Sequence, residues 1–287
     1  MDYQIHHTVP MSSPDLTDTE RQAVLDVLNS TSLSIGPQLR AFEAAISGYT
    51  GNRYAIGVNS GTSGLHLCVC AAGVKPGDIV ITTPFSFVSS TNAVLFEGGI
   101  PVFVDVDPVS GNIDAAMVEQ AASDLSQVGA AAARWLPQKN GKQVGDLKAI
   151  LGVDVFGQPA DWDSLRVTAG RYGLKLIEDS CESLGAEYRG RKTGTLGDTA
   201  VFAFYPNKQI TTGEGGMIVT DDEDAARMMR SLRNQGRSVG DTWLQHTYLG
   251  YNYRLDELSA ALRAAQMLRV EELLRKVEQL QAQVVAT

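Results

Sequence analysis

The sequence predicts an α/β protein of three layers, in which a mostly parallel central sheet carries helices on both faces. Two observations support this fold class. From residue 54 to residue 220, apolar segments of strand length alternate with segments of helix length. Glycines and small polar side chains follow several predicted strands, at the edge where ligands bind in parallel sheets.

The first helix is predicted over residues 17–30. Thr17 and Glu20 have the spacing of a capping box at its start. Its apolar face consists of Ala23, Val24, Val27 and Leu28. A second helix is predicted over residues 37–51, where Gly51 supplies a common helix end.

The remaining elements alternate along the chain. Predicted strands cover residues 54–58, 78–83, 101–106, 147–155, 174–179, 199–204 and 216–220. Predicted helices between them cover residues 62–73, 89–99, 112–123 and 160–173. A polar stretch, residues 137–146, precedes the strand that begins at residue 147.

Composition excludes several classes of protein. Hydrophobic residues make up 44% of the 287 residues and charged residues 20%, as in globular proteins. The net charge of −9 argues against a nucleic-acid partner. No apolar run reaches the roughly 18 residues of a membrane helix, and the N-terminus is too polar for a signal peptide. We expect no nucleic-acid or membrane partner.

Cysteine and histidine spacing predicts no metal site. The three cysteines are Cys68, Cys70 and Cys181, and the four histidines are His6, His7, His66 and His246. Neither set has the spacing of metal ligands, and the histidines form no catalytic triad. The odd number of cysteines indicates reduced thiols in a cytoplasmic protein.

The first candidate site is the segment "NSGTSG", which joins a predicted strand to a helix. Gly61, Thr62 and Ser63 place hydroxyls and backbone N–H groups at the helix N-terminus. Such a turn can bind an anion and suits a phosphate. The alternative is a serine cap with a glycine turn.

Two further turns carry charged groups. Asp179 follows Glu178 at the end of an apolar strand, where a carboxylate can neutralise a cationic ring nitrogen or cap a turn. Lys208 lies between two apolar strands and precedes several glycines, so it is either a loop lysine or a Schiff-base lysine. A phosphate turn, a buried acid and a lysine together match the needs of pyridoxal phosphate. Phe85 and Phe87 offer an aromatic cover for its ring.

These residues belong to longer motifs. They include "GPQLRAFEAAISGYTG", "NSGTSGLHL", "EDSCESLGA", "GDTAVFAFYPNKQITTGEGGMIVTDD" and "GYNYRLDELSAA". Over residues 9 to 275 the chain resembles the DegT/DnrJ/EryC1/StrS sugar aminotransferases, which have the aspartate-aminotransferase fold type I. The resemblance implies the large domain of a pyridoxal-phosphate-dependent transferase.

The resemblance also implies roles for individual residues. Lys208 would form the internal aldimine and move protons, and Asp179 would pair with the pyridinium nitrogen. The phosphate would be held by Gly61, Thr62 and Ser63. Phe87 would stack on the ring, and Asn252 would reach the phosphate of a neighbouring subunit in a homodimer with shared active sites. The substrates would be glutamate and a nucleotide-linked keto sugar, in a pathway of polysaccharide biosynthesis.

Two substitutions depart from the family pattern. Ala203 stands where many members have a phosphate-binding serine. Glu182 stands beside the cofactor where Gln or His is common, and related dehydratases also have an acidic residue in this region. Those dehydratases replace the lysine with histidine, so Lys208 favours transamination over dehydration.

The third departure is length. We expect an N-terminal segment and helix over residues 1–30, a cofactor-binding large domain over 31–240 and the start of a largely absent C-terminal small domain over 241–287. An apolar stripe at helical spacing runs through Val270, Leu273, Leu274, Val277, Leu280 and Val284. It predicts the first helix of that domain or part of a dimer contact. A catalytically incomplete fragment or regulatory subunit is the non-enzymatic alternative.

Overall fold

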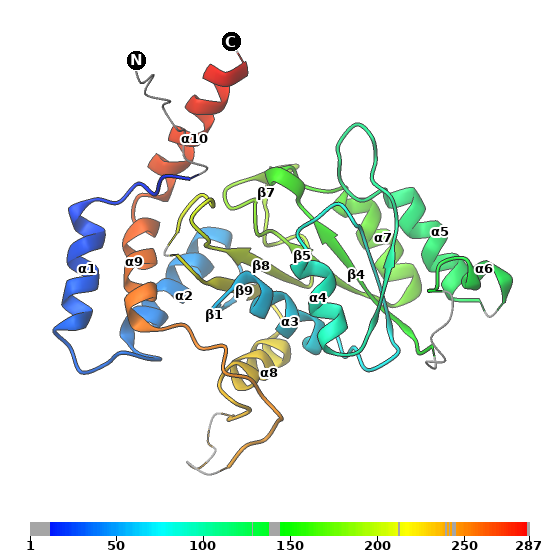
Figure 1. The fold of residues 1–287 in the computed structure, drawn as a ribbon, viewed down its shortest axis with the longest axis horizontal. Helices are drawn as coiled ribbons and strands as arrows, with labels where there is room; N and C mark the ends of the chain where they lie inside the picture. Colours follow the sequence, from blue (N-terminus) through cyan, green and yellow to red (C-terminus); the bar gives the residue numbers. More distant parts are fainter. Residues whose placement is uncertain are drawn as a thin grey trace, which may run out of the picture.

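The computed structural model describes residues 12–127, 129–137, 144–211, 213–238, 240, 242 and 245–285, with side chains up to residue 280. Most of the predicted polar stretch 137–146 and the side chain of Val284 lie outside the described residues. The chain forms a central sheet with helices packed on both sides (Figure 1).

The helices and strands follow one another in near-regular alternation. The helices are α1 (Asp18–Leu28), α2 (Pro37–Thr50), α3 (Gly61–Ala71), α4 (Ser89–Phe96), α5 (Ala115–Leu125), α6 (Ala130–Ala133), the 3₁₀ helix η1 (Val155–Gly157), α7 (Trp162–Tyr172), α8 (Glu223–Arg233), α9 (Glu257–Met267) and α10 (Val270–Val285). The strands are β1 (Tyr54–Val58), β2 (Ile79–Thr82), β3 (Ile100–Phe103), β4 (Leu147–Val153), β5 (Lys175–Asp179), β6 (Glu187–Tyr188), β7 (Arg191–Lys192), β8 (Thr199–Ala203) and β9 (Gly216–Thr220).

The main sheet has seven strands in the order β1-β9-β8-β5-β4-β2-β3. Strands β3, β2, β4, β5 and β8 pair in parallel. Strand β9 runs antiparallel to both of its neighbours, β8 and β1. The mostly parallel sheet that the sequence predicts is therefore confirmed, and β9 is the reversed strand within it.

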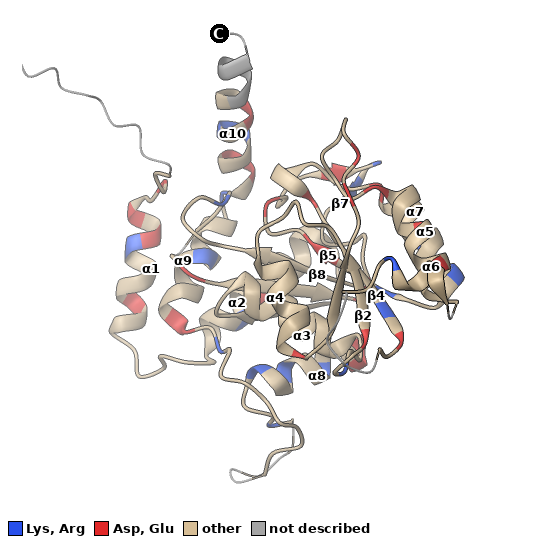
Figure 2. Cartoon of the chain, turned by 45° about the vertical axis from the view of Figure 1, so that its right-hand side comes forward, with Lys and Arg blue, Asp and Glu red and all other residues tan. Residues whose placement is uncertain are grey.

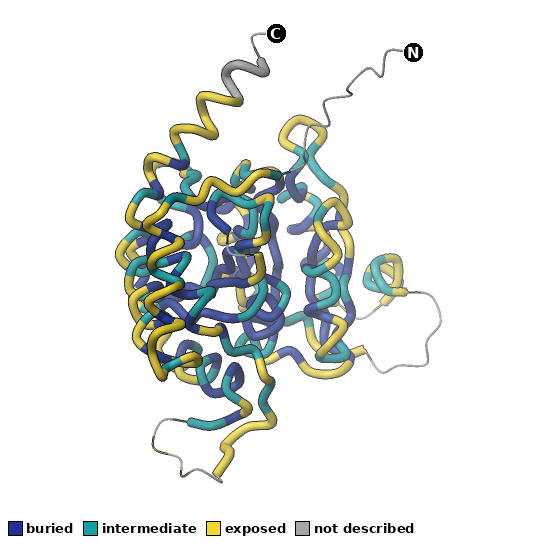
Figure 3. Tube along the Cα trace, turned by 60° about the vertical axis from the view of Figure 1, so that its left-hand side comes forward, coloured by how far each residue is buried: buried dark blue, intermediate teal, exposed yellow. Residues whose placement is uncertain are grey.

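Alternating side chains along the strands divide the core between the two faces. One face of the sheet packs against α3, α4 and α8. The other face packs against α5 and α7 at one end and against α2, α9 and the start of α10 at the other. On β9, for example, Ile218 faces the first group while Met217 and Val219 face the second. The three-layer fold is thus confirmed, and the strands β2 and β9 are buried along their whole length (Figure 3).

The predicted N-terminal helix is confirmed with one correction. Thr17 and Glu20 form the expected capping box. Leu28, which was expected on the apolar face, is 58% exposed, whereas Val27 is buried. Glu20 is also buried, because its carboxylate binds the guanidinium of Arg269 at 2.7 Å.

Five features were not predicted from the sequence: the short helix α6, the 3₁₀ helix η1, the β6–β7 hairpin, α8 and α9. Helix α9 packs on α1 and α2 (Figure 1). The proposed division into segments 1–30, 31–240 and 241–287 stays a prediction.

The predicted C-terminal helical stripe is α10, and its first turns are packed. Val270 and Leu273 are buried and Leu274 packs beside them, whereas Val277 is 39% exposed and Leu280 is 61% exposed. Basic and acidic residues occur along the described part of α10 as they do along α1 (Figure 2). Within the described part of the chain, no helix combines the length and the apolar character that a bilayer crossing requires.

Candidate active site

A cavity of about 760 Å³ opens at the carboxyl ends of β5 and β8. The start of α3, the turn before α4, η1 and the β8–β9 connection form its walls. Its lining includes Gly61, Thr62, Phe85, Phe87, Asp179, Glu182, Ala203 and Lys208. The structure therefore brings most of the predicted site residues into one pocket.

The N-terminus of α3 forms one wall. Ser60 is the N-cap, and its hydroxyl accepts a hydrogen bond from the backbone N–H of Ser63 at 3.0 Å. The hydroxyls of Thr62 and Ser89 lie 2.8 Å apart. Gly61 packs so closely on the neighbouring strand that a Cβ would come within 2.8 Å of the Ala203 Cβ.

Ser63 does not join this wall. Its hydroxyl donates to the side-chain oxygen of Asn59 at 2.7 Å, and the residue is absent from the pocket lining. In the structure Ser63 takes part in the helix cap, which was the alternative interpretation of this turn. Gly61 and Thr62 remain as the candidate anion-binding residues at this helix end.

Asp179 ends β5 inside the pocket and is 5% exposed. Its two carboxylate oxygens accept hydrogen bonds from the Ser90 hydroxyl at 2.7 Å and the Cys181 backbone N–H at 3.2 Å. Burial raises the pKa of Asp179, while these donors and the charge of Lys208 act in the opposite direction. A cationic partner in the pocket would favour the carboxylate further.

Lys208 lies in the turn between β8 and β9, where its backbone N–H donates to the Tyr205 carbonyl at 2.9 Å. Its side chain is 15% exposed, and its Nζ lies 2.9 Å from Glu182 Oε1. Glu182 Oε2 accepts the backbone N–H of Phe156 at 3.0 Å. Glu182 is therefore held between η1 and the lysine, so that one oxygen faces the amine.

Aromatic side chains border the mouth of the pocket. Phe87 is 79% exposed and lines it directly. Phe85 packs edge-to-face on Phe156, with ring centroids 5.9 Å apart. Phe156 is a pocket residue that was not predicted from the sequence, although its position after the end of β4 is a signal that could have identified it.

Asn252 lies outside the pocket lining. It is exposed and its backbone carbonyl accepts a hydrogen bond from the Asn59 side chain at 3.5 Å. The tyrosine rings on either side of it, Tyr251 and Tyr253, are stacked with centroids 5.0 Å apart. The role of Asn252 toward a neighbouring subunit stays a prediction.

Two further buried carboxyl groups, those of Asp154 and Glu178, lie near Asp179. Asp154 accepts hydrogen bonds from the Ala160 N–H at 3.1 Å and the Trp162 indole N–H at 2.8 Å on one oxygen. Its other oxygen lies 3.1 Å from the Ser180 hydroxyl, which is also 2.7 Å from Glu178. Burial and the negative charge of Glu178 raise the pKa of Asp154 to about 8.

Comparison with known proteins places the chain in a family. The model of the DegT/DnrJ/EryC1/StrS aminotransferase family matches residues 14–285. GDP-perosamine synthase of Caulobacter vibrioides is 39% identical over 265 residues, which cover 92% of this chain and 66% of the relative. The chain thus spans about two thirds of the length of the curated relatives that it matches.

Solved structures agree with this comparison. A DegT DnrJ EryC1 StrS aminotransferase from Brucella abortus superposes with a TM-score of 0.80 at 29% identity, over 89% of this chain and 64% of that chain. NtdA from Bacillus subtilis, solved with bound cofactor PMP, superposes with a TM-score of 0.72 at 29% identity, over 92% of this chain and 57% of that chain. The chain belongs to the DegT/DnrJ/EryC1/StrS aminotransferase family.

Proposed function

We propose that this protein is a pyridoxal-phosphate-dependent aminotransferase that transfers an amino group from glutamate to a nucleotide-linked keto sugar. The observation that carries the proposal is that Lys208 and Asp179 line the same pocket, and that the N-terminus of α3 forms one of its walls. The name of the 39% identical relative, GDP-perosamine synthase, supports a nucleotide-linked sugar as the substrate class.

The residues of the pocket fit pyridoxal phosphate. A cavity of about 760 Å³ lies within the range of cofactor sites. The N-terminal N–H groups of α3 and the Thr62 hydroxyl would hold the phosphate, and Gly61 leaves room that a side chain would fill. Asp179 would pair with the ring nitrogen, Phe87 would cover the ring, and Lys208 offers an amine for the aldehyde. When bound, the cofactor supplies an electron sink for bonds broken at the amino carbon.

The protein's own residues would orient the reactants and move protons. Glu182 Oε1, 2.9 Å from the Lys208 amine, is positioned to take the proton that this amine must lose before it can act as a base. The Phe156 N–H holds the other oxygen of Glu182, so this acceptor keeps its orientation. Ser90 holds Asp179 in place from the start of α4.

Dehydration is the less favoured alternative. It was suggested by the acidic residue at position 182, but the carboxylate of Glu182 pairs with Lys208, a residue that supports transamination. A product that loses a hydroxyl and gains no nitrogen would favour dehydration instead.

We also propose a homodimer with shared active sites in the cytoplasm. Phe87 lines the pocket, and Val88, Leu95 and Phe96 follow it in the turn and helix α4. All four are at least half exposed, and such apolar side chains suit contact with a second copy of the chain. Asn252 is exposed on its own segment and free of the pocket of its own chain. Three unpaired thiols are consistent with a reducing compartment.

The proposed chemistry can be tested without knowing the sugar. Purified protein is mixed with pyridoxal phosphate, reduced with borohydride and digested, and the modified peptide is located by mass spectrometry. We expect the adduct on Lys208, its absence in Lys208→Ala and its retention in Lys148→Ala, since Lys148 pairs with Asp146 on the surface. Glutamate should shift the absorption spectrum of the unreduced protein. A spectrum that glutamate leaves unchanged would contradict the proposed amino donor.

The acceptor is identified with ¹⁵N-glutamate and a panel of GDP-, UDP- and dTDP-linked keto sugars. Incorporation of ¹⁵N into one sugar confirms the transfer. For the dimer, Lys208→Ala and Asn252→Ala proteins are unfolded, mixed and refolded together. Shared sites predict recovery of up to about a quarter of the wild-type activity, because half of the dimers formed are mixed and each mixed dimer holds one intact site out of two. No recovery beyond the separate variants would exclude a shared site.

A further inference from the structure

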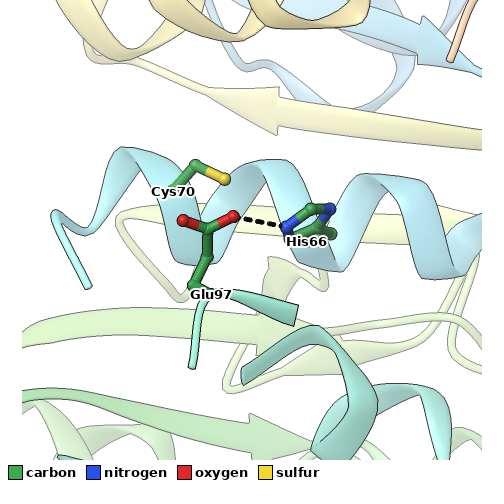
Figure 4. Close-up of side chains that lie close together, drawn as sticks. All are labelled: His66, Cys70 and Glu97. Atoms are coloured by element: carbon green, nitrogen blue, oxygen red, sulfur yellow. Dashed lines mark hydrogen bonds and ion pairs between the residues drawn. The ribbon is translucent and has the colours of Figure 1, made fainter. Parts of the chain in front are cut away.

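His66, Cys70 and Glu97 form a cluster of three metal-binding side chains outside the pocket. His66 and Cys70 lie one turn apart on the same face of α3, and Glu97 directly follows α4. The ligand atoms of the three residues all lie within 4.8 Å of one another. Figure 4 shows Cys70 and His66 on one helix, with the Glu97 carboxylate against both.

We propose that His66, Cys70 and Glu97 bind a zinc ion. Imidazole nitrogen, thiolate sulfur and carboxylate oxygen are the ligands that zinc accepts in proteins, and spacing of four residues on a helix places two of them on one side of the ion. Three protein ligands leave a fourth tetrahedral position for water. The Glu97 side chain is 23% exposed, so water and the ion can enter from that side.

The surroundings of the cluster hold these ligands in orientation. His66 is 2% exposed, and its Nδ1 lies 3.0 Å from the Tyr253 hydroxyl while its Nε2 lies 2.8 Å from Glu97 Oε1. The Tyr251 hydroxyl donates to the same Glu97 oxygen at 2.9 Å. Hydrogen bonds of this kind to the second nitrogen of a histidine and to a carboxylate are common around bound zinc.

Proton balance can be followed at each ligand. Without a metal, a neutral His66 carries its hydrogen on Nε2, because the Glu97 carboxylate can only accept. Zinc would take the Nε2 lone pair, and the hydrogen would move to Nδ1, where the Tyr253 hydroxyl can accept it. The Cys70 thiol would lose its proton to solvent as the zinc–sulfur bond forms.

Charge balance favours the bound ion. The Cys70 sulfur lies within 4.8 Å of the Glu97 carboxylate, so a thiolate at this position needs a cation nearby. A divalent ion with one thiolate and one carboxylate has no net charge, which suits a partly buried position. Binding should therefore release about one proton per zinc ion and strengthen as pH rises.

The position of the cluster suggests what the ion would do. Tyr251 contacts Glu97, Tyr253 contacts His66, and Asn252 lies between the two tyrosines in sequence. Bound zinc would hold Glu97 and His66 in place, and through them residues 251–253 against α3 and α4. This would restrict the motion of Asn252. Zinc binding itself does not depend on the proposed function, because its ligands lie outside the pocket lining.

The test uses the whole chain and zinc alone. Protein freed of metal with a chelator is dialysed and titrated with Zn²⁺ against a chromophoric competitor, with Mg²⁺ as the control ion. We expect one zinc per chain at submicromolar affinity, release of about one proton, and no competition by Mg²⁺. Co²⁺ in place of Zn²⁺ should produce a near-ultraviolet sulfur-to-cobalt absorption band.

Variants assign the ligands. Cys70→Ser and His66→Gln should each weaken zinc binding by at least about tenfold and remove or shift the cobalt band. Cys181→Ser and His246→Gln are the matched controls and should bind as the wild type does. Failure of the wild-type protein to bind zinc stoichiometrically overturns the proposal, whatever the variants do. Tight binding that Cys70→Ser and His66→Gln both leave unchanged also overturns it, because the ion would then lie elsewhere.

Discussion

Replacing Asp154 with asparagine should stabilise the protein at pH 8 and change its stability little near pH 4. The Ser180 hydroxyl lies between Asp154 and Glu178 but has one hydrogen, so it cannot donate to both carboxylates. Burial raises the pKa of both acids, and we infer that one of the two carries a proton in the folded protein near neutral pH. The surroundings of the two groups identify which one.

The Glu178 carboxylate is surrounded by hydrogen-bond donors. Its oxygens accept backbone N–H groups from Gly194, from Leu196 at 2.8 Å and from Gly197 at 2.9 Å, and these donors stabilise the ionised form. Asp154, by contrast, has one oxygen that faces only the hydroxyls of Ser180 and Ser183. A hydroxyl can accept as well as donate, so we assign the proton to this oxygen of Asp154.

The magnitude follows from the pKa of Asp154. It is about 8 in the folded state, against 3.8 for an ordinary aspartate. Between these values the folded state binds a proton that the unfolded state has lost, so the free energy of unfolding falls as pH rises. At about 1.4 kcal/mol per pH unit, the loss between pH 4 and pH 8 is on the order of 5 kcal/mol. Asparagine resembles the protonated acid and has no such loss.

The assay is thermal and urea unfolding of wild-type, Asp154→Asn and Glu178→Gln proteins from pH 5 to pH 8. Asparagine can accept from Trp162 and donate to Ser180, so its melting temperature at pH 8 should exceed that of the wild type by about 10 °C. In Glu178→Gln, the amide NH₂ group would face backbone N–H donors. We expect the free energy of unfolding to fall by about 1–3 kcal/mol. Stabilisation by Glu178→Gln, or a pH-independent loss in Asp154→Asn, would refute the proton assignment.

Three further substitutions test packing and capping. Glu257→Ala removes a buried carboxylate that accepts three backbone N–H groups at the start of α2, and we expect urea unfolding to show a loss on the order of 3 kcal/mol. Gly61→Ala should weaken binding of pyridoxal phosphate at least about tenfold in a spectroscopic titration, whereas Gly48→Ala, which has open space, should not. Gly185→Ala places a Cβ 2.4 Å from a leucine methyl of α10, at a residue whose φ is +92°. It should lower the melting temperature more than Gly190→Ala, where the added Cβ has open space and only backbone strain acts. Equal losses in the two variants would contradict the packing argument.

Much of the fold could be predicted because local patterns determine it. The boundaries of β1 and β9 agree with the predicted strands, since short apolar runs bounded by polar turns are typical of buried strands. Helix α8 was missed because it contains few large apolar residues, although Asp222 caps its start. The burial of Glu20 could not be predicted, because its partner Arg269 lies at the far end of the chain.

Part of the site could also be predicted from the sequence, for the same reason. Strand ends meet at one edge of a parallel sheet, so Asp179 and Lys208 could be expected together before their contacts were known. No local pattern shows whether a hydroxyl such as that of Ser63 faces a pocket or a helix cap. The cluster of His66, Cys70 and Glu97 was missed because α3 and α4 pack together only in the fold, and Glu97 has no fixed spacing to the other two.

The reversed strand β9 has a consequence for synthesis of the chain on the ribosome. Among the described strands, β1 lies at the edge of the sheet and has β9 as its neighbour, so residues 54–58 find this partner only after residues 216–220 have emerged. At translation rates of about 5–20 residues per second this interval lasts on the order of 10–30 s. During that time β1 and the N-terminus of α3 lack the strand that supports them. The pocket wall at the start of α3, for which we propose phosphate binding, should therefore be among the last parts of the pocket to form. An early-binding chaperone would find β1 as an exposed apolar segment.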